Sequence, residues 1–309
     1  MDKVHIIVNP FSAQGKTEER WKIIKEVITH YFREFKYIFT EKPKQATEIA
    51  RSLLKDGYDL IIGVGGDGTL NEITNGFFNE NSSTTINEES ALGIIPSGTG
   101  SDFVRSIKLP RDFNKSVKLI KNSKSKKIDI GRITFPNLKN KQENYKYFIN
   151  ISDFGLGADV VKNLSSIPPT KRGAFAYYKG MLLTLKRYKS KNVKMIIDNS
   201  HEINNKFLIV AIANGRIFGG GMIIAPEAKL DDGYFDVILI EDMKKLEIIK
   251  NSRHLYTGSI KKNPKVTIIK AKNIKVYSDE EVNIEYDGET GEILPAEFEL
   301  IEKVINFRL

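Results

Sequence analysis

Residues 59–72 read DLIIGVGGDGTLNE, and this stretch decides the fold. A short apolar run stops at the closely spaced Gly65, Gly66 and Gly68, and an amphipathic segment follows them. This order predicts a strand, a tight turn and a helix. We expect the turn to visit positive φ and to admit a ligand closely, because glycine has no Cβ to obstruct either.

The same turn predicts an anion site. Backbone N–H groups converge at the start of a helix, and a phosphate is their usual ligand. Asp67 stands beside this place, and a carboxylate repels a phosphate unless a divalent cation or water lies between them. The turn therefore indicates a nucleoside polyphosphate with Mg²⁺. The alternative is a plain strand–helix turn, which rarely needs three glycines in four positions.

The composition narrows the class of protein. The 309 residues suffice for about two domains, each with its own core. The absence of cysteine excludes disulfides, thiolate metal sites and cysteine nucleophiles, and the four histidines have no metal-ligand spacing. A net charge of +9 favours anionic partners without choosing between nucleic acid, membrane and a phosphorylated small molecule.

The chain shows neither a signal peptide nor an apolar run long enough to span a bilayer. We therefore expect a cytoplasmic protein that touches a membrane only at its surface.

The first part of the chain alternates strands and helices, which predicts a doubly wound, mainly parallel sheet. The expected elements are Val4–Val8, Thr17–Tyr31, Phe35–Phe39, Gln45–Leu54, Leu60–Val64 and Leu92–Ile95. Ligands bind such sheets at the carboxyl ends of the strands. Asn9, Thr40, Gly66 and Gly98 each follow a strand, so we expect them to gather at one edge.

Beyond a polar run at Lys121–Lys127, interpreted as a linker, the pattern changes to short strands joined by turns. This half predicts a mainly antiparallel β-sandwich with one helical stretch, Gly173–Tyr188. The expected domains are 1–127 and 128–309, with about the last ten residues packing back on the first domain. The expected strands are Ile128–Phe135, Tyr145–Ile151, Val193–Asp198, Phe207–Ala213, Phe235–Ile240, Val266–Ile269, Ile274–Tyr277 and Val282–Tyr286.

One motif is misleading. Residues 10–17, PFSAQGKT, nearly match the phosphate-binding loop G-x-x-x-x-G-K-[ST]. Proline replaces the first glycine, and its fixed φ and missing N–H prevent that loop from closing. We expect this segment to contribute polar groups near a nucleotide bound at residues 65–69 instead.

Several motifs, in order, resemble the diacylglycerol kinase catalytic domain family of bacterial lipid kinases. GGDGTLNE at residues 65–72 resembles its nucleotide motif, and serine at position 101 departs from the asparagine that the family usually has there. The other resembling segments are Val8–Pro10, Pro96–Phe103, Phe218–Met222, Ala225–Asp236 and Tyr286–Glu289. The resemblance covers nearly the whole chain and implies an α/β domain like that of NAD kinase and diacylglycerol kinase, followed by the β-rich domain.

The resemblance also implies roles for individual residues. Glu289 would be the proton acceptor, and Asp67 would take part in catalysis. The carbonyl of Lys229, the carboxylate of Asp232 and the carbonyl of Tyr234 would hold a structural Mg²⁺. The ATP site would be lined by Asn9, Pro10, Phe11, Ser12, Ala13, Thr40, Gly66, Asp67, Gly68, Thr69, Leu70, Asn71, Glu72 and Thr99.

The chemistry agrees with these roles, since phosphoryl transfer needs positioning, charge neutralisation and a carboxylate for the acceptor's proton. Simple turns stay the alternative at Asp231–Gly233 and Asp287–Glu289.

We therefore predict an ATP-dependent lipid kinase that converts diacylglycerol to phosphatidic acid. The alternatives are a kinase of a sphingoid base, ceramide or phosphatidylglycerol, an NAD kinase, and a non-catalytic lipid- or nucleotide-sensing protein. We expect a lipid substrate and an anionic membrane surface at the inner side of the membrane as partners, and no nucleic acid. The sequence leaves a homodimer open.

The predicted helix Gly173–Tyr188 is a candidate membrane anchor. It carries apolar residues at helical spacing, Phe175, Tyr178, Leu182 and Leu185. The flanking basic residues are Lys171, Arg172, Lys186, Arg187, Lys189 and Lys191. An interfacial helix has this composition. The alternative is that the apolar stripe packs into the second domain and the lysines face water.

Overall fold

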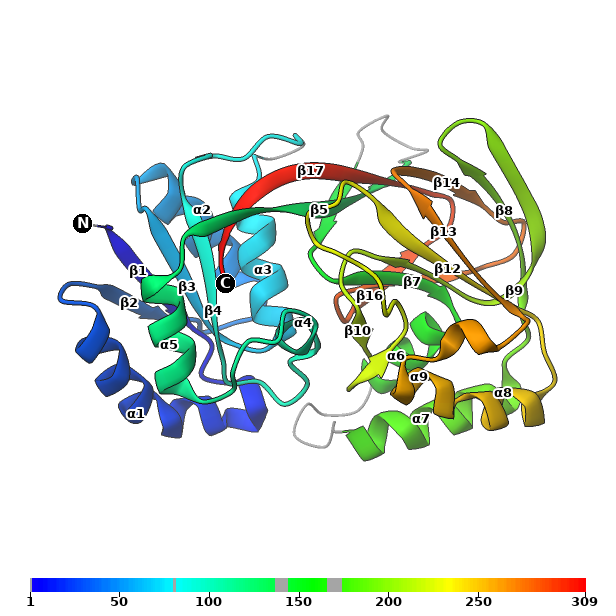
Figure 1. The fold of residues 1–309 in the computed structure, drawn as a ribbon, viewed down its shortest axis with the longest axis horizontal. Helices are drawn as coiled ribbons and strands as arrows, with labels where there is room; N and C mark the ends of the chain where they lie inside the picture. Colours follow the sequence, from blue (N-terminus) through cyan, green and yellow to red (C-terminus); the bar gives the residue numbers. More distant parts are fainter. Residues whose placement is uncertain (1, 80–81, 137–143, 166–173) are drawn as a thin grey trace. The chain divides into compact units, whose positions relative to one another are not determined.

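The computed structural model describes residues 2–79, 82–136, 144–165 and 174–309 (Figure 1). The chain forms two compact units, which we call unit 1 and unit 2. Unit 1 comprises the residues up to Ile130 together with Glu302–Leu309, and unit 2 comprises Gly131–Ile301. The boundary thus falls after Ile130 rather than after Lys127, and the C-terminal residues are part of unit 1.

Unit 1 is built on a parallel sheet with the strand order β2-β1-β3-β4-β17. Its strands are β1 (Val4–Val8), β2 (Lys36–Phe39), β3 (Leu60–Gly65), β4 (Ala91–Pro96) and the end of β17 (Ala296–Arg308). Its helices are η1 (Ser12–Gly15), α1 (Lys16–Tyr31), α2 (Gln45–Lys55), α3 (Asp67–Phe77), α4 (Asp102–Ser106) and α5 (Phe113–Asn122).

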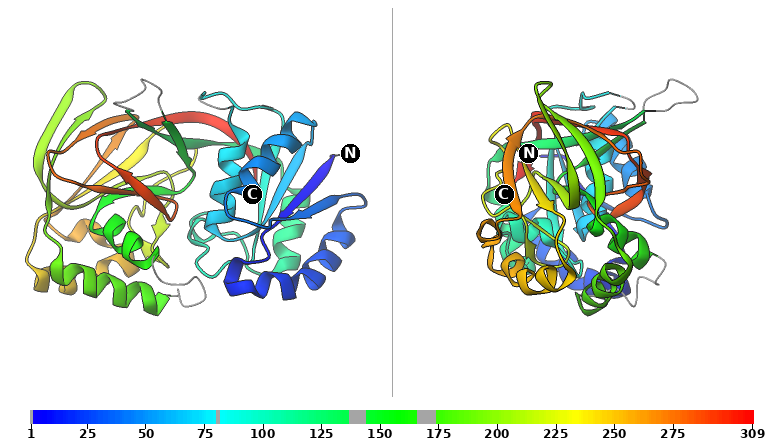
Figure 2. Two further views of the ribbon diagram at one scale, coloured as in Figure 1. Left: turned by 180° about the vertical axis from the view of Figure 1, so that it is seen from behind. Right: turned by 90° about the vertical axis from the view of Figure 1, so that its right-hand side faces the viewer.

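Helices cover both faces of this sheet. Strands β3 and β4 are buried along their whole length, which is why their sequences are continuously apolar. Helix α1 buries Trp21, Ile24 and Ile28, one stripe at helical spacing, against β1, β3 and α5. Figure 2 shows α2 and α3 on the opposite face, which confirms the doubly wound α/β fold.

Unit 2 is antiparallel, and its strands follow the order β16-β15-β7-β9-β8-β14-β17. Strand β12 pairs with β9 and β13 pairs with β12, whereas β5 pairs with β17 and β6 pairs with β5. Its strands are β5 (Ser125–Phe135), β6 (Asn144–Phe148), β7 (Ile151–Gly155), β8 (Lys191–Ile197), β9 (His201–Ala213), β10 (Ile217–Phe218), β11 (Met222–Ile223), β12 (Phe235–Glu241), β13 (Val266–Ala271), β14 (Asn273–Tyr277), β15 (Asn283–Tyr286) and β16 (Glu289–Ile293). Its helices are α6 (Leu156–Ser165), α7 (Ala174–Arg187), α8 (Lys245–Asn251), α9 (Arg253–Thr257) and η3 (Ile260–Lys262).

Alternating residues on β12 build two cores. Val237 and Leu239 face the interior of the sandwich, where large side chains such as Phe154 and Phe298 meet. Ile238 and Ile240 point to the other face, which α6, α7 and η3 cover. The described strand pairs within unit 2 are all antiparallel, as predicted.

Two segments differ from the sequence prediction. Lys121–Lys127 is not a linker, because α5 ends at Asn122 and β5 begins at Ser125 with its first side chains exposed. The predicted strand Tyr145–Ile151 breaks into β6 and β7, because the backbone at residues 149–151 donates its N–H groups to Asp287. The helices α4, α5, α6, α8 and α9 were not predicted either.

No helix among the described residues combines the length and the apolar character needed to cross a membrane.

Candidate active site

The loops that follow β1, β3 and β4 meet at the carboxyl ends of the unit 1 strands. The N–H groups of Ser97 and Gly98 both donate to the carbonyl of Gly65, at 2.9 and 3.0 Å. The side-chain amide of Asn9 donates to the Thr69 hydroxyl at 3.0 Å. Thr40, after β2, donates its N–H to Val8 at 2.9 Å. The predicted gathering of these four segments is therefore present.

The glycines of the turn are needed for close packing, not for positive φ. Gly65, Gly66 and Gly68 are not left-handed, and Gly66 is extended, so the expectation of positive φ is wrong. A Cβ on Gly65 would collide with Thr69, and a Cβ on Gly98 would collide with the backbone of Gly66. A Cβ on Gly68 would meet no atom of the protein within 4 Å. Only Gly68 therefore faces space that a ligand can enter.

Asp67 ties two loops together. Its carboxylate accepts the N–H groups of Asp102 at 2.9 Å and of Phe103 at 3.1 Å, so it caps α4 from the start of α3. Burial raises the pKa of Asp67, the Asp102 carboxylate adds to this, and the two N–H bonds oppose it. The structure thus gives Asp67 a positioning role, because it holds the loop after β4 against the glycine turn.

Some of the other predicted nucleotide residues lie near the glycine turn, and others have structural contacts elsewhere in unit 1. Ser12 bonds to the Asn9 carbonyl at 2.9 Å, and Ala13 and exposed Thr99 line a hollow described below. Leu70 lies in the core, and Glu72 accepts the N–H of Ala46 at 3.1 Å, which places its carboxylate at the start of α2. The remaining predicted residues are buried Pro10, exposed Phe11 and buried Asn71.

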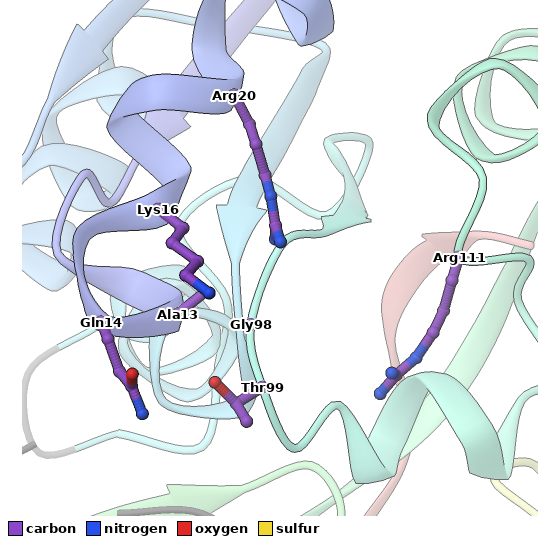
Figure 3. A pocket seen from close by; sticks show the side chains of 7 residues that line it. All are labelled: Ala13, Gln14, Lys16, Arg20, Gly98, Thr99 and Arg111. Carbon is purple, nitrogen blue, oxygen red and sulfur yellow. The ribbon is translucent and has the colours of Figure 1, made fainter. Parts of the chain in front are cut away.

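A basic hollow of about 360 Å³ lies beside the glycine turn, and Figure 3 shows its lining. Its cations are Lys16 and Arg20, one turn apart on α1, and Arg111, which donates to the Gly100 carbonyl at 2.9 Å. Gly98, which packs on Gly66, joins the hollow to the turn. Three cations around one hollow suit a polyphosphate.

The sequence prediction did not include these cations. The near-match GKT at residues 15–17 was the one signal for Lys16, and it was set aside because Pro10 prevents a phosphate-binding loop. The structure has no such loop, since η1 contains Ala13 and Gln14 in left-handed conformation. No local pattern marks Arg111, which reaches the hollow only through the fold.

Ser101, which stands where the family usually has asparagine, lies in the turn before α4. It stands before α4 with φ of 53°, a left-handed conformation in which asparagine is much less strained than most residues. The buried Ser101 hydroxyl donates to the Gly98 carbonyl at 3.3 Å, inside the loop. Its side chain stabilises the turn from within.

In unit 2, Glu289 stands at the end of a rigid turn. Asp287 and Gly288 have φ of 47° and 92°, so the β15–β16 hairpin uses the tight turn with two left-handed residues that Asp-Gly favours. The Asp287 carboxylate accepts three backbone N–H groups, from Ile149 at 2.7 Å, Asn150 at 3.0 Å and Ile151 at 3.1 Å. Glu289 itself is exposed. An exposed carboxylate on a fixed turn suits a general base.

The predicted Mg²⁺ ligands lie in the loop before β12, beside a hollow of about 530 Å³. One Asp232 oxygen accepts the N–H of Tyr234 at 3.2 Å, and the other pairs with the Lys270 ammonium at 2.9 Å. Lys270 also pairs with buried Asp236 at 3.0 Å. Burial lowers the pKa of Lys270, but these two carboxylates outweigh it, so its pKa lies above the usual value.

This arrangement does not fit a bound Mg²⁺. The Lys270 ammonium lies where a cation would bind Asp232, and it would repel a second cation there. The carbonyl groups of Lys229 and Tyr234 stay predicted ligands.

Comparisons with known proteins bear on the family and the fold. The family described as "Diacylglycerol kinase catalytic domain" matches residues 3–133, and the family described as "YegS C-terminal NAD kinase beta sandwich-like domain" matches residues 152–307. A protein of Staphylococcus epidermidis named diacylglycerol kinase is 34% identical over 266 residues, which cover 86% of this chain and 79% of that protein.

Two solved structures share the fold. A putative diacylglycerol kinase of Bacillus anthracis is 25% identical with a TM-score of 0.79, covering 99% of this chain and 95% of that one. Yeast NADH kinase complexed with NADH has a TM-score of 0.52 at 13% identity, covering 99% of this chain and 83% of that one, which shows likeness of fold alone. The chain is therefore a kinase that belongs to the diacylglycerol kinase family.

Proposed function

We propose that this kinase transfers the γ-phosphoryl group of ATP to the hydroxyl of a membrane lipid, and that diacylglycerol is that lipid. The observation that carries the proposal is the basic hollow of Lys16, Arg20 and Arg111 beside the glycine turn, where Gly68 leaves space for a ligand. Backbone N–H groups at the start of α3 and these cations would bind the phosphates of ATP, which arrives as its Mg²⁺ complex.

Glu289 would act on the acceptor. As the hydroxyl oxygen of diacylglycerol forms its bond to the γ-phosphorus, the bond from that phosphorus to the β–γ bridging oxygen breaks and ADP leaves. The hydroxyl proton passes to the Glu289 carboxylate, and phosphatidic acid is the product. Asp67 would contribute by holding the loop after β4 in place.

The acceptor is argued from the relatives, several of which are named diacylglycerol kinase. An apolar lining discriminates weakly between lipids that each offer a hydroxyl. A sphingoid base, ceramide or phosphatidylglycerol is therefore the main alternative substrate. NAD is a weaker alternative, because the Gly-Gly-Asp-Gly-Thr motif is followed here by Leu-Asn-Glu. The sensing alternative loses its support, since the chain is a kinase and keeps both Asp67 and Glu289.

We also propose that the protein works at an anionic membrane surface, at the inner side of a cell membrane. On α7, Lys186 and Arg187 are exposed, and Leu183 is 60% exposed. Neighbouring α8 exposes Leu246 by 81%. Apolar side chains framed by basic ones are typical of an interfacial surface.

The proposed surface differs in part from the predicted stripe. Leu185 is buried in unit 2, which agrees with the alternative that the apolar stripe packs into the second domain. Leu182 is half-buried. Lys171 and Arg172, and the side chains of Phe175 and Tyr178, lie outside the described residues. That the protein binds no nucleic acid stays a prediction, and a homodimer stays an open alternative.

A substrate panel tests the proposed function. The purified protein receives γ-labelled ATP with mixed micelles of diacylglycerol, ceramide, sphingosine or phosphatidylglycerol, and with NAD in a separate arm. We expect label in phosphatidic acid at a rate at least about tenfold above every other product, a difference of about 1.4 kcal/mol in transition-state stabilisation. Preferential label in another lipid or in NADP would overturn the diacylglycerol assignment, and label in none would overturn the kinase proposal for all of these acceptors.

A further inference from the structure

Two carboxyl groups face each other inside unit 2, next to the turn that carries Glu289. Asp153 on β7 and Glu285 on β15 are register partners in adjacent strands, so their side chains lie on the same face. They are 1% and 6% exposed, and each carboxyl group contributes to the pKa of the other. A carboxyl–carboxyl hydrogen bond requires a proton, because two carboxylates have only acceptors.

Among the described residues, no cation acts on the pKa of either carboxyl group in this pair. The groups that act on Asp153 and Glu285 from neighbouring elements are Asp159 of α6 and Asp287 of the turn, both acidic. The phenol of Tyr188, which follows α7, is a further titratable neighbour, and burial together with the carboxylates of Asp159, Asp153 and Glu280 keeps its pKa above the usual value. Lys162, the nearby lysine of α6, reaches Asn283 at 2.8 Å instead.

The backbone decides which carboxyl holds the proton. The Asp153 carboxylate lies against Gly157 in the first turn of α6, where the start of the helix favours a negative charge. Glu285 has the carboxylate of Asp287 as a neighbour, which disfavours a second charge. Burial raises the pKa of Asp153 to about 7 and raises that of Glu285 well above its usual value. The shared proton therefore resides on Glu285.

Glu285 connects this pair to the turn. Its Oε1 accepts the N–H of Gly288, the residue directly before Glu289. The Ser152 hydroxyl donates to the Glu285 carbonyl at 2.6 Å and fixes the strand beneath it. Hydrogen bonds therefore hold the turn on both sides. One side is held by the three N–H groups that donate to Asp287, and the other is held by the bond from Gly288 to Glu285.

We propose that Asp153 and Glu285 share one proton, and that this proton holds Glu285 against Gly288 and so positions Glu289. Asp153 and Glu285 are positioning residues in this scheme. The inference rests on the proposed function for the role of Glu289, whereas the shared proton itself does not. When the last proton leaves at alkaline pH, two buried negative charges repel each other and the turn loses its fastening.

Three variants test the catalytic part. Glu285→Gln keeps a donor for Asp153 and an acceptor for Gly288, so kcat at neutral pH should stay within about threefold and its alkaline decline should move to higher pH. Glu285→Met removes both bonds, so kcat should fall at least about tenfold with an unchanged KM for ATP. Ser152→Ala, the matched control, removes a bond in the same strand pair and should keep the wild-type pH profile.

A second readout does not depend on catalysis. Because both pKa values are raised on folding, the folded pair binds more protons than the unfolded chain, and stability falls as pH rises from about 4 through the folded values. The urea midpoint of the wild type should therefore fall relative to that of Glu285→Gln between pH 5 and 9. If the urea midpoints of the wild type and of Glu285→Gln change with pH in the same way, the shared proton is overturned. This comparison can be made even if Glu285→Met does not fold.

The outcomes separate the two claims. If the urea midpoints of the wild type and of Glu285→Gln diverge with pH but kcat is unchanged in folded Glu285→Met, the positioning role is overturned. Full activity of Glu289→Gln beside diverging midpoints would overturn the proposed base and leave the shared proton standing.

Discussion

Gly68 is the residue of the glycine turn at which ligand binding and folding can be separated. Its backbone is not left-handed and its Cβ position is open, so Gly68→Ala should leave thermal stability within about 0.5 kcal/mol of the wild type. A methyl group in the ligand's space should raise the Kd for ATP at least about tenfold, which is about 1.4 kcal/mol. Calorimetric titration with ATP measures this.

Gly65→Ala is the control for this prediction, because its Cβ would collide with Thr69 and should lower stability. An unchanged ATP affinity in folded Gly68→Ala would mean that the phosphates bind elsewhere. The segment Gly15–Thr17 would then be a candidate for the phosphate site.

Lys270 decides whether the loop before β12 needs a metal. Its ammonium neutralises Asp232 and Asp236, so Mg²⁺ should change the wild-type thermal midpoint by no more than about 1 °C. Lys270→Met leaves two carboxylates without a cation, and Mg²⁺ should then raise the midpoint by several degrees. Lys261→Met, which removes a 2.6 Å pair with Glu227 beside the same hollow, is the control and should not acquire this dependence.

A Mg²⁺ titration that stabilises the wild type as strongly as Lys270→Met would contradict the cation role of Lys270. It would favour the ligand set predicted from the family resemblance, in which Lys229, Asp232 and Tyr234 hold the ion.

At the scale of elements, the sequence pattern predicted those helices, strands and turns that are determined by residues close together in the chain. The buried strands β3 and β4 and the stripe of α1 follow from apolar periodicity, and the Asp-Gly hairpin follows from its turn residues. The strand β5 was predicted from Ile128 onward, and its polar start at residues 125–127 was missed because its partner, β17, lies far away in sequence. The break at residues 149–150 depends on Asp287, which is equally distant.

The candidate site was predictable to the same extent. Glycines and acidic residues in motifs could be located, and the gathering of Asn9, Thr40 and Gly66 followed from the strand order. The reason for each glycine, the cap made by Asp67 and the contribution of Arg111 arise from contacts between segments that share no local pattern.

For the whole molecule, the excess of basic residues predicts binding to anionic bilayers. The wild type should co-sediment with vesicles that contain anionic lipid, much less with neutral vesicles, and salt should release it. Each basic residue near the surface contributes on the order of 1 kcal/mol. A variant with glutamine at Lys186, Arg187, Lys189 and Lys191 should lose binding and activity on vesicles, but not activity on a soluble short-chain substrate.

The control is a variant with glutamine at four lysines of unit 1, which loses the same amount of charge. These are Lys22, Lys25, Lys115 and Lys118. Equal binding to neutral and anionic vesicles, insensitive to salt, would contradict the electrostatic surface and favour insertion of apolar side chains such as Leu183 and Leu246.

The central claim is that this molecule passes a phosphoryl group from ATP to diacylglycerol with Glu289 as the base. Its most direct test is the rate of phosphatidic acid formation by the wild type and by Glu289→Gln, with Glu292→Gln on the same strand as the control. The account predicts that Glu289→Gln lowers kcat by about 10²–10⁴-fold while ATP affinity and the thermal midpoint stay at wild-type values. A kcat for folded Glu289→Gln within about threefold of the wild type, less than 1 kcal/mol, would contradict it.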